Sequence, residues 1–539
     1  MFPSPLLLGA VAVEGYVVLA VELLAIRQLT PYVGNATDTV AIVIAAVLLP
    51  LAFGYEAGGR VRFTSDRAPG GDAAASGADA PGSARAASPG AGPEAGVRRR
   101  LTRNLLLAAL ILSFGLSHPY LVAFFGALDG VGITHRLVQT VLHACLFLVY
   151  PVYLLGQTVP LVAHCSTGAS LPRSTGLMLF FSTFGSFLGS VVSTLVLMTF
   201  WGVHATVAFT LGLLVLLAGL IGRRTWARAE QVSPEKASPR HLVGHRESDA
   251  PAIRPPRAKR TLRPKGAGTP KGVPEGRPDK LLVAAGALGL YIFAVNAPSV
   301  MRAYGIVGDG LHSQIRVLAD PAENSRLLVI NNSPSSKWAA DPGRRFAYVE
   351  FIEREVLGAL DPGRPHRVLV VGAGGFTIGL EDEVNAYTYV DIDPALRGVS
   401  EEHFLRRPLG ANKLFVAESA RAFLRRAGEP YDVVVLDAFT NRLNMPPDLI
   451  TREAFAAVRR AVAPGGRVVV NVIASPDFED RFSRSIDATL RAVFPFADRH
   501  VLNRTRADGV ANVLYLARGR GDGAHDVYTD DRNRSFLDH

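Results

Sequence analysis

Cysteine is almost absent from this sequence of 539 residues, which contains only Cys145 and Cys165. Two cysteines supply neither a disulfide framework nor a four-ligand zinc site. His366, His403 and His500 show no ligand spacing, so the sequence predicts no metal site. A P-loop lysine and a catalytic serine–histidine signature are also lacking, which argues against phosphoryl and acyl transfer.

Acidic residues are outnumbered by basic ones, 47 to 57, and the formal net charge is +10. The excess is concentrated in residues 223–280, which hold 15 lysines and arginines against six acids. A basic balance can indicate nucleic-acid binding, but a basic segment between apolar runs is typical of a membrane protein. We therefore predict no nucleic-acid partner.

Charge is scarce in the long apolar runs of the N-terminal half. A helix needs roughly 20 apolar residues to cross a bilayer, and seven segments fit. They lie at about 4–26, 39–55, 105–126, 137–163, 175–201, 204–222 and 281–300. The first lacks the positive n-region and cleavage site of a signal peptide, so we expect a retained helix. The sequence predicts a multi-pass protein of the cell membrane whose helices contact membrane lipid.

Large apolar residues are scarce in two stretches between these helices. Residues at about 65–100 are mainly Ala, Gly, Ser and Pro, and 223–280 is rich in Pro and basic residues. Such segments cannot bury enough surface to offset their ordering entropy, so we predict disorder. The predicted organisation is a six-helix bundle at 1–222, the linker at 223–280, a seventh helix at 281–300, a soluble domain at 301–520 and a tail at 521–539.

The side on which each loop lies follows from Lys and Arg near the helix ends. Basic residues after the second, fourth and sixth helices include Arg60, Arg62, Arg98, Arg99, Arg100, Arg173, Arg223 and Arg224. The other loops hold little beyond Arg27 and Arg136. This asymmetry predicts a cytoplasmic N-terminus. If all seven segments cross, the soluble domain lies outside the cytoplasm. If one segment is re-entrant, the domain lies in the cytoplasm. The sequence leaves both possibilities open.

Ionisable residues inside membrane helices indicate function by default, and here they are Glu14, Glu22 and His143. The alternative is structural, with Glu22 pairing with a nearby base such as Arg27 and fixing helix packing. The segment FGSFLG (184–189) places two glycines four residues apart, which favours close packing of helices.

From residue 301 short apolar runs alternate with helical stretches. Strands are predicted at 367–372, 386–393, 413–419, 431–439 and 466–473, with helices at 420–427 and 451–462 among the connections. This alternation predicts a Rossmann-like, doubly wound α/β domain with a parallel sheet. Ligands of such sheets bind at the carboxyl ends of the strands.

Gly372, Gly374 and Gly375 follow the first of these strands, where glycine lets the backbone approach a ligand closely. Asp391 ends the next strand, 19 residues after Gly372. A carboxylate with this spacing can accept hydrogen bonds from ribose hydroxyls. The combination predicts a nucleoside site, although a glycine loop alone could be a plain turn. Dinucleotide and S-adenosyl ligands both suit this geometry.

Further motifs follow one another in order. They are SQIRV (313–317), YVE (348–350), VLVVGAGG (368–375), VDID (390–393), YDVVVLDAF (431–439), MPPDLITREAF (445–455) and APGGRVVVNV (463–472). The series resembles the spermidine synthase, or polyamine aminopropyltransferase, family. The segments GLMLFFSTFGSFLGSVVSTLVL and LGQTVPL are similar to the membrane helices of its membrane-fused branch.

The resemblance implies a fold of the S-adenosylmethionine methyltransferase type and a transferase activity without a metal. An aminopropyl group would pass from decarboxylated S-adenosylmethionine to putrescine or a related amine, leaving methylthioadenosine. Residues implied for the co-substrate are Gln314, Gly372, Gly374, Gly375, Asp391 and Glu418. Tyr348 and Asp437 are implied for the amine, with Asp437 as the catalytic base.

Two acids of the family are missing. Gly375 stands where the family has an acid within the glycine loop, and Thr440 where it has a second acid three residues after Asp437. The co-substrate half of the pocket is therefore better matched than the amine half. Acids that could substitute for them are Glu350, Glu353 and Asp448.

Some of these residues have structural interpretations as well. Asp437 could be a solvated acid at a strand end or a helix cap. Asp393 could cap the following helix, and Tyr348 could belong to the core. The alternative functions are methyl transfer from S-adenosylmethionine, or a non-catalytic membrane carrier or sensor that binds a nucleoside or polyamine. A homo-oligomer is left open.

Overall fold

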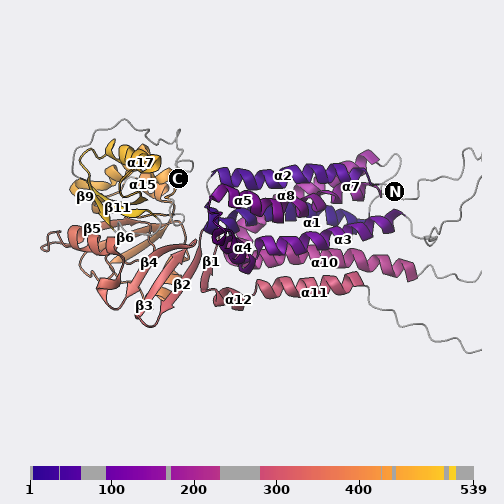
Figure 1. Cartoon of the computed structure of the whole chain (residues 1–539), viewed down its shortest axis with the longest axis horizontal. Helices are drawn as coiled ribbons and strands as arrows, with labels where there is room; N and C mark the ends of the chain where they lie inside the picture. The colour runs from indigo at the N-terminus through magenta and orange to yellow at the C-terminus, as the bar shows by residue number, and fades with distance from the viewer. Residues whose placement is uncertain are drawn as a thin grey trace, which may run out of the picture.

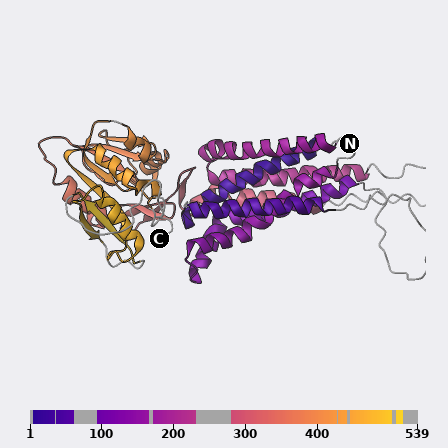
Figure 2. The ribbon, with the colours of Figure 1, turned by 90° about the horizontal axis from the view of Figure 1, so that it is seen from above.

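The computed structural model describes residues 4–34, 37–61, 93–165, 171–230, 280–426, 428–439, 445–502 and 509–517. They form a helical bundle and an α/β body that lies at one end of it (Figure 1, Figure 2). Most of the two stretches predicted as disordered, and the tail at 521–539, lie outside the described residues. Helix α3 begins at Pro93 and α10 ends at Glu230, so both extend further into those stretches than predicted.

The bundle follows the predicted apolar segments. Its helices are α1 (Pro5–Val33), α2 (Thr37–Gly59), α3 (Pro93–Leu116), α4 (His118–Gly130), α5 (Arg136–Ala144), α6 (Tyr150–Gly156), α7 (Thr158–Ala163), α8 (Leu171–Val191), α9 (Met198–Phe200), α10 (Val203–Glu230) and α11 (Lys280–Val295). Among the described residues, six helical stretches are long and apolar enough to cross a membrane, and α3 with α4 makes a seventh if that pair is one span. By their length and composition, these helices suggest a membrane protein.

The third predicted segment is broken between α3 and α4, which meet with a bend of 62°. Pro119 lies in the first turn of α4, a position that suits proline but does not allow the preceding helix to continue through it. The Gln28 side chain donates to the carbonyl oxygen of Leu116 at 3.0 Å. This bond satisfies one of the carbonyls that the end of α3 leaves without a helical partner.

Helices α1 and α8 approach each other at glycines. A Cβ atom on Gly15, Gly185 or Gly189 would overlap a backbone carbonyl of the facing helix. The two glycines of FGSFLG therefore have the packing role that was predicted. Glu14 is buried in the same contact and accepts a hydrogen bond from Ser182 Oγ at 3.2 Å.

The α/β body contains two sheets. The first is antiparallel, with the order β1 (Ile306–Asp309), β2 (Gln314–Asp320), β3 (Ser325–Ile330), β4 (Ser333–Ala339). The second has the order β10 (Asp498–Leu502), β11 (Ala511–Leu516), β9 (Val462–Ala474), β8 (Tyr431–Leu436), β5 (Arg367–Val371), β6 (Ala386–Asp391), β7 (Lys413–Ala417). Its connections include α13 (Ala347–Phe351), α14 (Leu396–Val399), α15 (Ala420–Arg425), α16 (Arg452–Ala461) and α17 (Arg481–Arg491).

The predicted parallel strands are all present and neighbour one another from β9 to β7. The sheet as a whole is mixed, because β10 and β11 pair antiparallel, and the sheet β1–β4 was not predicted. Val371 at the end of β5 pairs with Val390 on one side and with Leu436 on the other. This register brings the residues that follow, Gly372 and Asp437, to the same edge as Asp391 at the end of β6.

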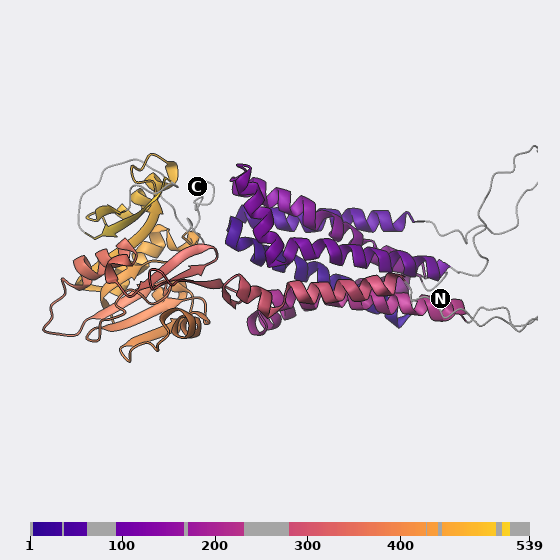
Figure 3. The same ribbon diagram turned by 60° about the horizontal axis from the view of Figure 1, so that its bottom comes forward.

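The hairpin between β1 and β2 joins the two bodies. α11 and α12 (Pro298–Ala303) lead from the bundle into this hairpin (Figure 1, Figure 3). Arg27 Nε of α1 donates to the carbonyl oxygen of Gly310 at 3.0 Å, and no ion pair between Arg27 and Glu22 occurs among the described residues. The Asp309 carboxylate pairs with the His204 ring and accepts from the His204 backbone N–H at 3.0 Å. Burial opposes the ionisation of Asp309, but His204 and Arg27 outweigh it and lower its pKa.

We expect Asp309→Asn to lower the thermal stability of the full chain in detergent. The substitution removes the negative partner of a buried charge cluster, a change that costs about 3–5 kcal/mol. Asp309 bonds to His204 of α10 and is attracted by the charge of Arg27 of α1, so the loss should loosen the α/β body from the bundle. Melting curves followed by tryptophan fluorescence measure the effect. Glu355→Gln, in an exposed pair with Arg354, is the control; equal melting temperatures for both variants would contradict the prediction.

Candidate active site

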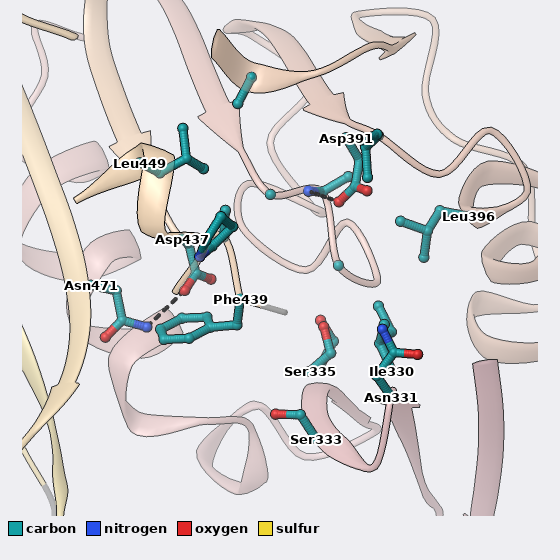
Figure 4. Close-up of a pocket in the computed structure, with 18 of the residues that line it drawn as sticks. Ile330, Asn331, Ser333, Ser335, Asp391, Leu396, Asp437, Phe439, Leu449 and Asn471 are labelled. Carbon is teal, nitrogen blue, oxygen red and sulfur yellow. Dashed lines mark hydrogen bonds between the residues drawn. The ribbon is translucent and has the colours of Figure 1, made fainter. Parts of the chain in front are cut away.

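A cavity of about 610 Å³ lies at the edge of the sheet where β5, β6 and β8 end. Its wall combines the ends of these strands with the β3–β4 hairpin, mainly the start of β4, and Thr30 of α1 also contributes. Figure 4 shows Asp391 and Asp437 on either side of the loop after β5, with Ser333, Ser335 and Asn331 facing them from the antiparallel sheet. The cavity is at the place where open α/β sheets bind ligands.

The glycine loop is shaped by positive backbone angles and by close contacts. Gly372 has a φ of 91° and Gly374 a φ of 49°, conformations that favour glycine. A Cβ atom on Gly372 would overlap the backbone carbonyl of Asp437. The Gly375 N–H donates to Ser336 Oγ at 2.8 Å, which ties the loop to the antiparallel sheet. The loop therefore presents bare backbone to the cavity.

Asp391 is positioned by backbone donors at the end of β6. The N–H of Ala373 donates to its Oδ2 at 3.1 Å, and the N–H of Asp393 donates to its Oδ1 at 3.1 Å. Burial raises the pKa of Asp391 to about 6, although these N–H groups favour the carboxylate. Asp393 itself accepts from Ala395 N–H at 2.9 Å, just before α14. Asp393 therefore shapes the turn before α14 and does not line the cavity. It does not cap that helix, contrary to its structural interpretation, because the N-cap residue of α14 is Ala395 and no side chain caps it.

Asp437 follows β8 and is also fixed by neighbours. Asn471 Nδ2 of β9 donates to Asp437 Oδ1 at 2.7 Å, and Asn512 Nδ2 donates to Asn471 Oδ1 at 3.1 Å. Burial raises the pKa of Asp437 to about 7, while hydrogen bonds from Asn471 and the Tyr348 hydroxyl oppose the rise. A carboxyl group with this pKa can exchange protons near neutral pH.

Tyr348 is both a core residue and part of the cavity wall. Its ring packs in the core below the sheet, and its hydroxyl lies beside Asp437 and 3.3 Å from the carbonyl oxygen of Ser335. Burial, together with the negative charge of Asp437, raises the pKa of Tyr348 well above its usual range. The phenol therefore stays protonated and can donate to the carboxylate.

Several predicted residues lie away from the cavity lining. The Gln314 amide lies 3.4 Å from His118 Nδ1 of the bundle, and Glu418 pairs with Arg426. Glu350 does not line the cavity, and its buried Oε1 has no partner among the described residues. The structure thus brings together Gly372, Gly374, Asp391, Tyr348 and Asp437, with Gly375 just behind, but not Gln314, Glu350 or Glu418.

Polar residues that the sequence did not single out complete the site. Asn471 could have been recognised as an amide within the apolar run VVVNVI of β9, whose neighbours are buried. Ser333, Ser335 and Ser336 gave no such signal, since serine is common in turns. Of the acids considered as substitutes, Asp448 lines the cavity, whereas Glu353 accepts from Gly379 N–H at 3.3 Å. Thr440 lies outside the described residues.

We expect Gly375→Asp, which restores the acid of the soluble synthases, to destabilise the domain by about 1–3 kcal/mol and not to raise activity. A Cβ atom at Gly375 would overlap the Phe404 ring and lie 2.9 Å from Ser336 Cβ. Thermal unfolding of the full chain measures the loss of stability. Adding Phe404→Leu to Gly375→Asp should reduce that loss, because the smaller side chain makes room for the new Cβ atom. The control is Gly398→Asp, because nothing lies within 4 Å of a Cβ there. An unchanged melting temperature would contradict this.

No family model matches the chain. A polyamine aminopropyltransferase of Vibrio vulnificus is 28% identical over 161 residues, which are 29% of this chain and 52% of that protein. Putrescine N-methyltransferase 2 of Nicotiana attenuata is 30% identical over 157 residues, 28% of this chain and 41% of that protein. The chain thus spans about half the length of the curated relatives it matches.

Among solved structures, the probable spermidine synthase of Corynebacterium glutamicum is 24% identical, with a TM-score of 0.34. The match covers 39% of this chain and 78% of that one. The sequence relatives named polyamine aminopropyltransferase support the resemblance to the spermidine synthase family for the C-terminal part of the chain. The names do not extend it to the membrane helices.

Proposed function

We propose that the chain is a membrane-bound aminopropyltransferase that joins the aminopropyl group of decarboxylated S-adenosylmethionine to an amine. The observation that carries the proposal is the placement of two fixed carboxylates, Asp391 and Asp437, on either side of a glycine loop in one cavity. One carboxylate suits a ribose and the other suits a reacting amine. The relatives named polyamine aminopropyltransferase support the same assignment.

The co-substrate half of the cavity fits an S-adenosyl group. Both Asp391 oxygens are oriented by backbone donors, so their remaining lone pairs can accept from ribose hydroxyls. Ser419 and Leu449 line the wall beyond β7 and β8, where a flat base would lie. Gly372 and Gly374 leave room for the chain between ribose and sulfur. When bound, the sulfonium supplies a good leaving group, so the protein has mainly to position two reactants.

The amine half of the cavity supplies a base. The amine nitrogen attacks the carbon bonded to sulfur, the carbon–sulfur bond breaks with its electron pair on sulfur, and the amine proton passes to Asp437. Because the pKa of Asp437 is about 7, the carboxylate is present at neutral pH and still basic enough to take that proton. Tyr348 and Asn471 orient the carboxylate toward the cavity.

Methyl transfer from S-adenosylmethionine is the second candidate. The glycine loop has no acid to select an aminopropyl ammonium over a methionine carboxylate, and the packing around Gly375 leaves no room for one. A protein named putrescine N-methyltransferase 2 is 30% identical to this chain over 157 residues, which supports methyl transfer as the alternative.

Product analysis separates the candidates. The purified full chain in detergent is incubated with an amine and either decarboxylated S-adenosylmethionine or S-adenosylmethionine. Methylthioadenosine formed only with the decarboxylated compound supports aminopropyl transfer, and S-adenosylhomocysteine formed with the other supports methyl transfer. Nucleoside binding without either product would overturn both and leave a binding protein.

We also propose that the α/β body lies on the side of the membrane away from the cytoplasm. The end of the bundle that holds the N-terminus is opposite the α/β body (Figure 1, Figure 2). That end carries Arg60, Arg98 to Arg100, and Arg173. At the other end, Arg136 pairs with Asp38 at 3.2 Å and Arg27 is buried against Gly310. Positive charge favours the cytoplasmic side, so the co-substrate would have to be present on the opposite side.

Fusions after residue 539 test the orientation. Alkaline phosphatase fused to a membrane protein is active only outside the cytoplasm. Green fluorescent protein in the same position fluoresces only when it stays in the cytoplasm. An active phosphatase fusion with a dark fluorescent fusion is expected. The reverse pattern would overturn the orientation and would place the end of the bundle that holds the N-terminus outside the cytoplasm.

A further inference from the structure

The wall around Asp437 is neutral. Tyr348, Asn471 and Asn512 contribute a phenol and two amides, and Phe439 and Ile473 contribute apolar surface. The Asn512 amide donates to Asn471, and the Asn471 amide donates to Asp437. Both amides therefore position the proposed base. The wall therefore offers one negative charge, on Asp437, to whatever binds beside it.

The other carboxylates of the cavity are placed for different tasks. Among the described residues, the cavity lining holds Asp391, Asp437 and Asp448 as its acids. Asp391 accepts a hydrogen bond from Ala373 N–H in the glycine loop, so it lies in the co-substrate half of the cavity. Asp448 is exposed to solvent, where an ion pair contributes little to binding. The segment directly after Phe439 reads TNRLN and contains no acid.

A diamine such as putrescine brings two amino groups into the site. One loses its proton and reacts, but the other stays an ammonium and must leave water. A buried ammonium is costly unless a carboxylate pairs with it. Because Asp437 serves the reacting nitrogen, the described wall leaves the second ammonium without a buried partner. An amine with an uncharged remainder avoids this cost and gains from contact with Phe439 and Ile473.

The cavity also reaches the membrane bundle. Thr30, near the end of α1, and His312, in the β1–β2 hairpin, line it, and Leu311 of that hairpin packs against the apolar core of the bundle. A cavity bounded by the end of a membrane helix is accessible to molecules that concentrate at the membrane surface. An apolar chain on the acceptor would be suited to this position.

We propose that the acceptor is a primary monoamine with an uncharged, apolar remainder, in place of a diamine. This inference rests on the proposed aminopropyl transfer and specifies its acceptor. The nitrogen of the neutral amine forms a bond to the aminopropyl carbon, the carbon–sulfur bond breaks toward sulfur, and the displaced proton goes to Asp437. The products are a secondary amine and methylthioadenosine.

The test compares putrescine with n-butylamine, which has the same four carbons and lacks the second nitrogen. The full chain in detergent is assayed with decarboxylated S-adenosylmethionine by methylthioadenosine release. We expect kcat/KM for butylamine to exceed that for putrescine at least about tenfold, the usual value of one charge-assisted hydrogen bond. Hexylamine should be better still. A preference for putrescine would overturn the inference, whereas no release with any amine would overturn the proposed function itself.

Two variants sharpen the comparison. Asn512→Asp places a second carboxylate in the amine wall, and we expect it to raise the ratio of putrescine to butylamine turnover about tenfold. Asp448→Asn removes the exposed acid and should leave the ratio as it is. If Asp448→Asn lowered putrescine turnover selectively, Asp448 would be the partner of the second ammonium, and the inference would be wrong.

Discussion

Replacing Asp437 by asparagine is expected to lower kcat/KM by about 10²–10⁴-fold, the usual contribution of a positioned general base. The amide has the size of the carboxylate and can still meet Asn471, but it cannot accept the amine proton. Binding of methylthioadenosine should change little, because we assign those contacts to Asp391 and the glycine loop. Turnover is measured by methylthioadenosine release, and affinity by calorimetry.

Asp432→Asn is the matched control, because Asp432 lies at the other end of the same strand. Its carboxylate pairs with Arg364 at 2.9 Å and accepts from Arg367 N–H at 2.9 Å, away from the cavity. We expect the control to keep its turnover. Full activity of Asp437→Asn, or an equal loss in the two variants, would show that Asp437 is a strand-end acid without a catalytic role.

The dependence of kcat/KM on pH should show the ionisation of Asp437. Burial raises the pKa of Asp437 to about 7, so the carboxylate form, which is the base, predominates above pH 7. Below that value the slope of log(kcat/KM) against pH should increase by one, because only the ionised fraction of Asp437 accepts a proton. In Asp437→Asn this inflection should be absent. A profile that stays flat from pH 5 to 8 in the unchanged protein would contradict the assignment.

Replacing Asp391 by asparagine should weaken nucleoside binding by about 10²-fold or more. Hydrogen bonds from ribose hydroxyls to a carboxylate are worth about 1.5–3 kcal/mol each, and an amide keeps only part of this. Both Asp391 oxygens also accept backbone N–H groups, so the NH₂ of an asparagine would face one of these donors. Calorimetric titration with methylthioadenosine measures the loss.

Asp393→Asn provides the control two residues away in the same DID motif. Asp393 Oδ1 accepts from Ala395 N–H, while its buried Oδ2 has no partner among the described residues. An asparagine can keep the first bond and place its NH₂ at the second position. Nucleoside affinity should therefore change far less than in Asp391→Asn. Similar losses in both variants would mean that the loop shape, and not the Asp391 carboxylate, determines binding.

The sequence predicted those parts of the fold that depend on local pattern. Apolar length predicted the membrane segments, and the buried valines of β5 and β8 predicted the parallel sheet. The spacing from Gly372 to Asp391 predicted that both would reach the same sheet edge, which the pairing of Val371 with Val390 confirms. The break between α3 and α4 could have been predicted from Pro119, which prevents a helix from continuing through it, but it was not predicted.

Placement that depends on contacts between the two bodies could not be predicted. Gln314 matches a family position, yet its amide lies against His118 of the bundle. The β1–β4 sheet was missed because its strands are short and only one of its motifs was recognised. Positive φ angles at Asn324, Asn331 and Asn332 mark its turns, and asparagine is the residue that tolerates them.

We propose that Asp391 and Asp437 hold the two reactants on opposite sides of the glycine loop. A structure of the full chain with methylthioadenosine and butylamine would locate both reactants. We expect ribose hydroxyls hydrogen-bonded to Asp391 and the amine nitrogen within about 2.6–3.2 Å of the Asp437 carboxylate. A nucleoside bound away from Asp391, or an amine nitrogen out of reach of Asp437, would contradict it.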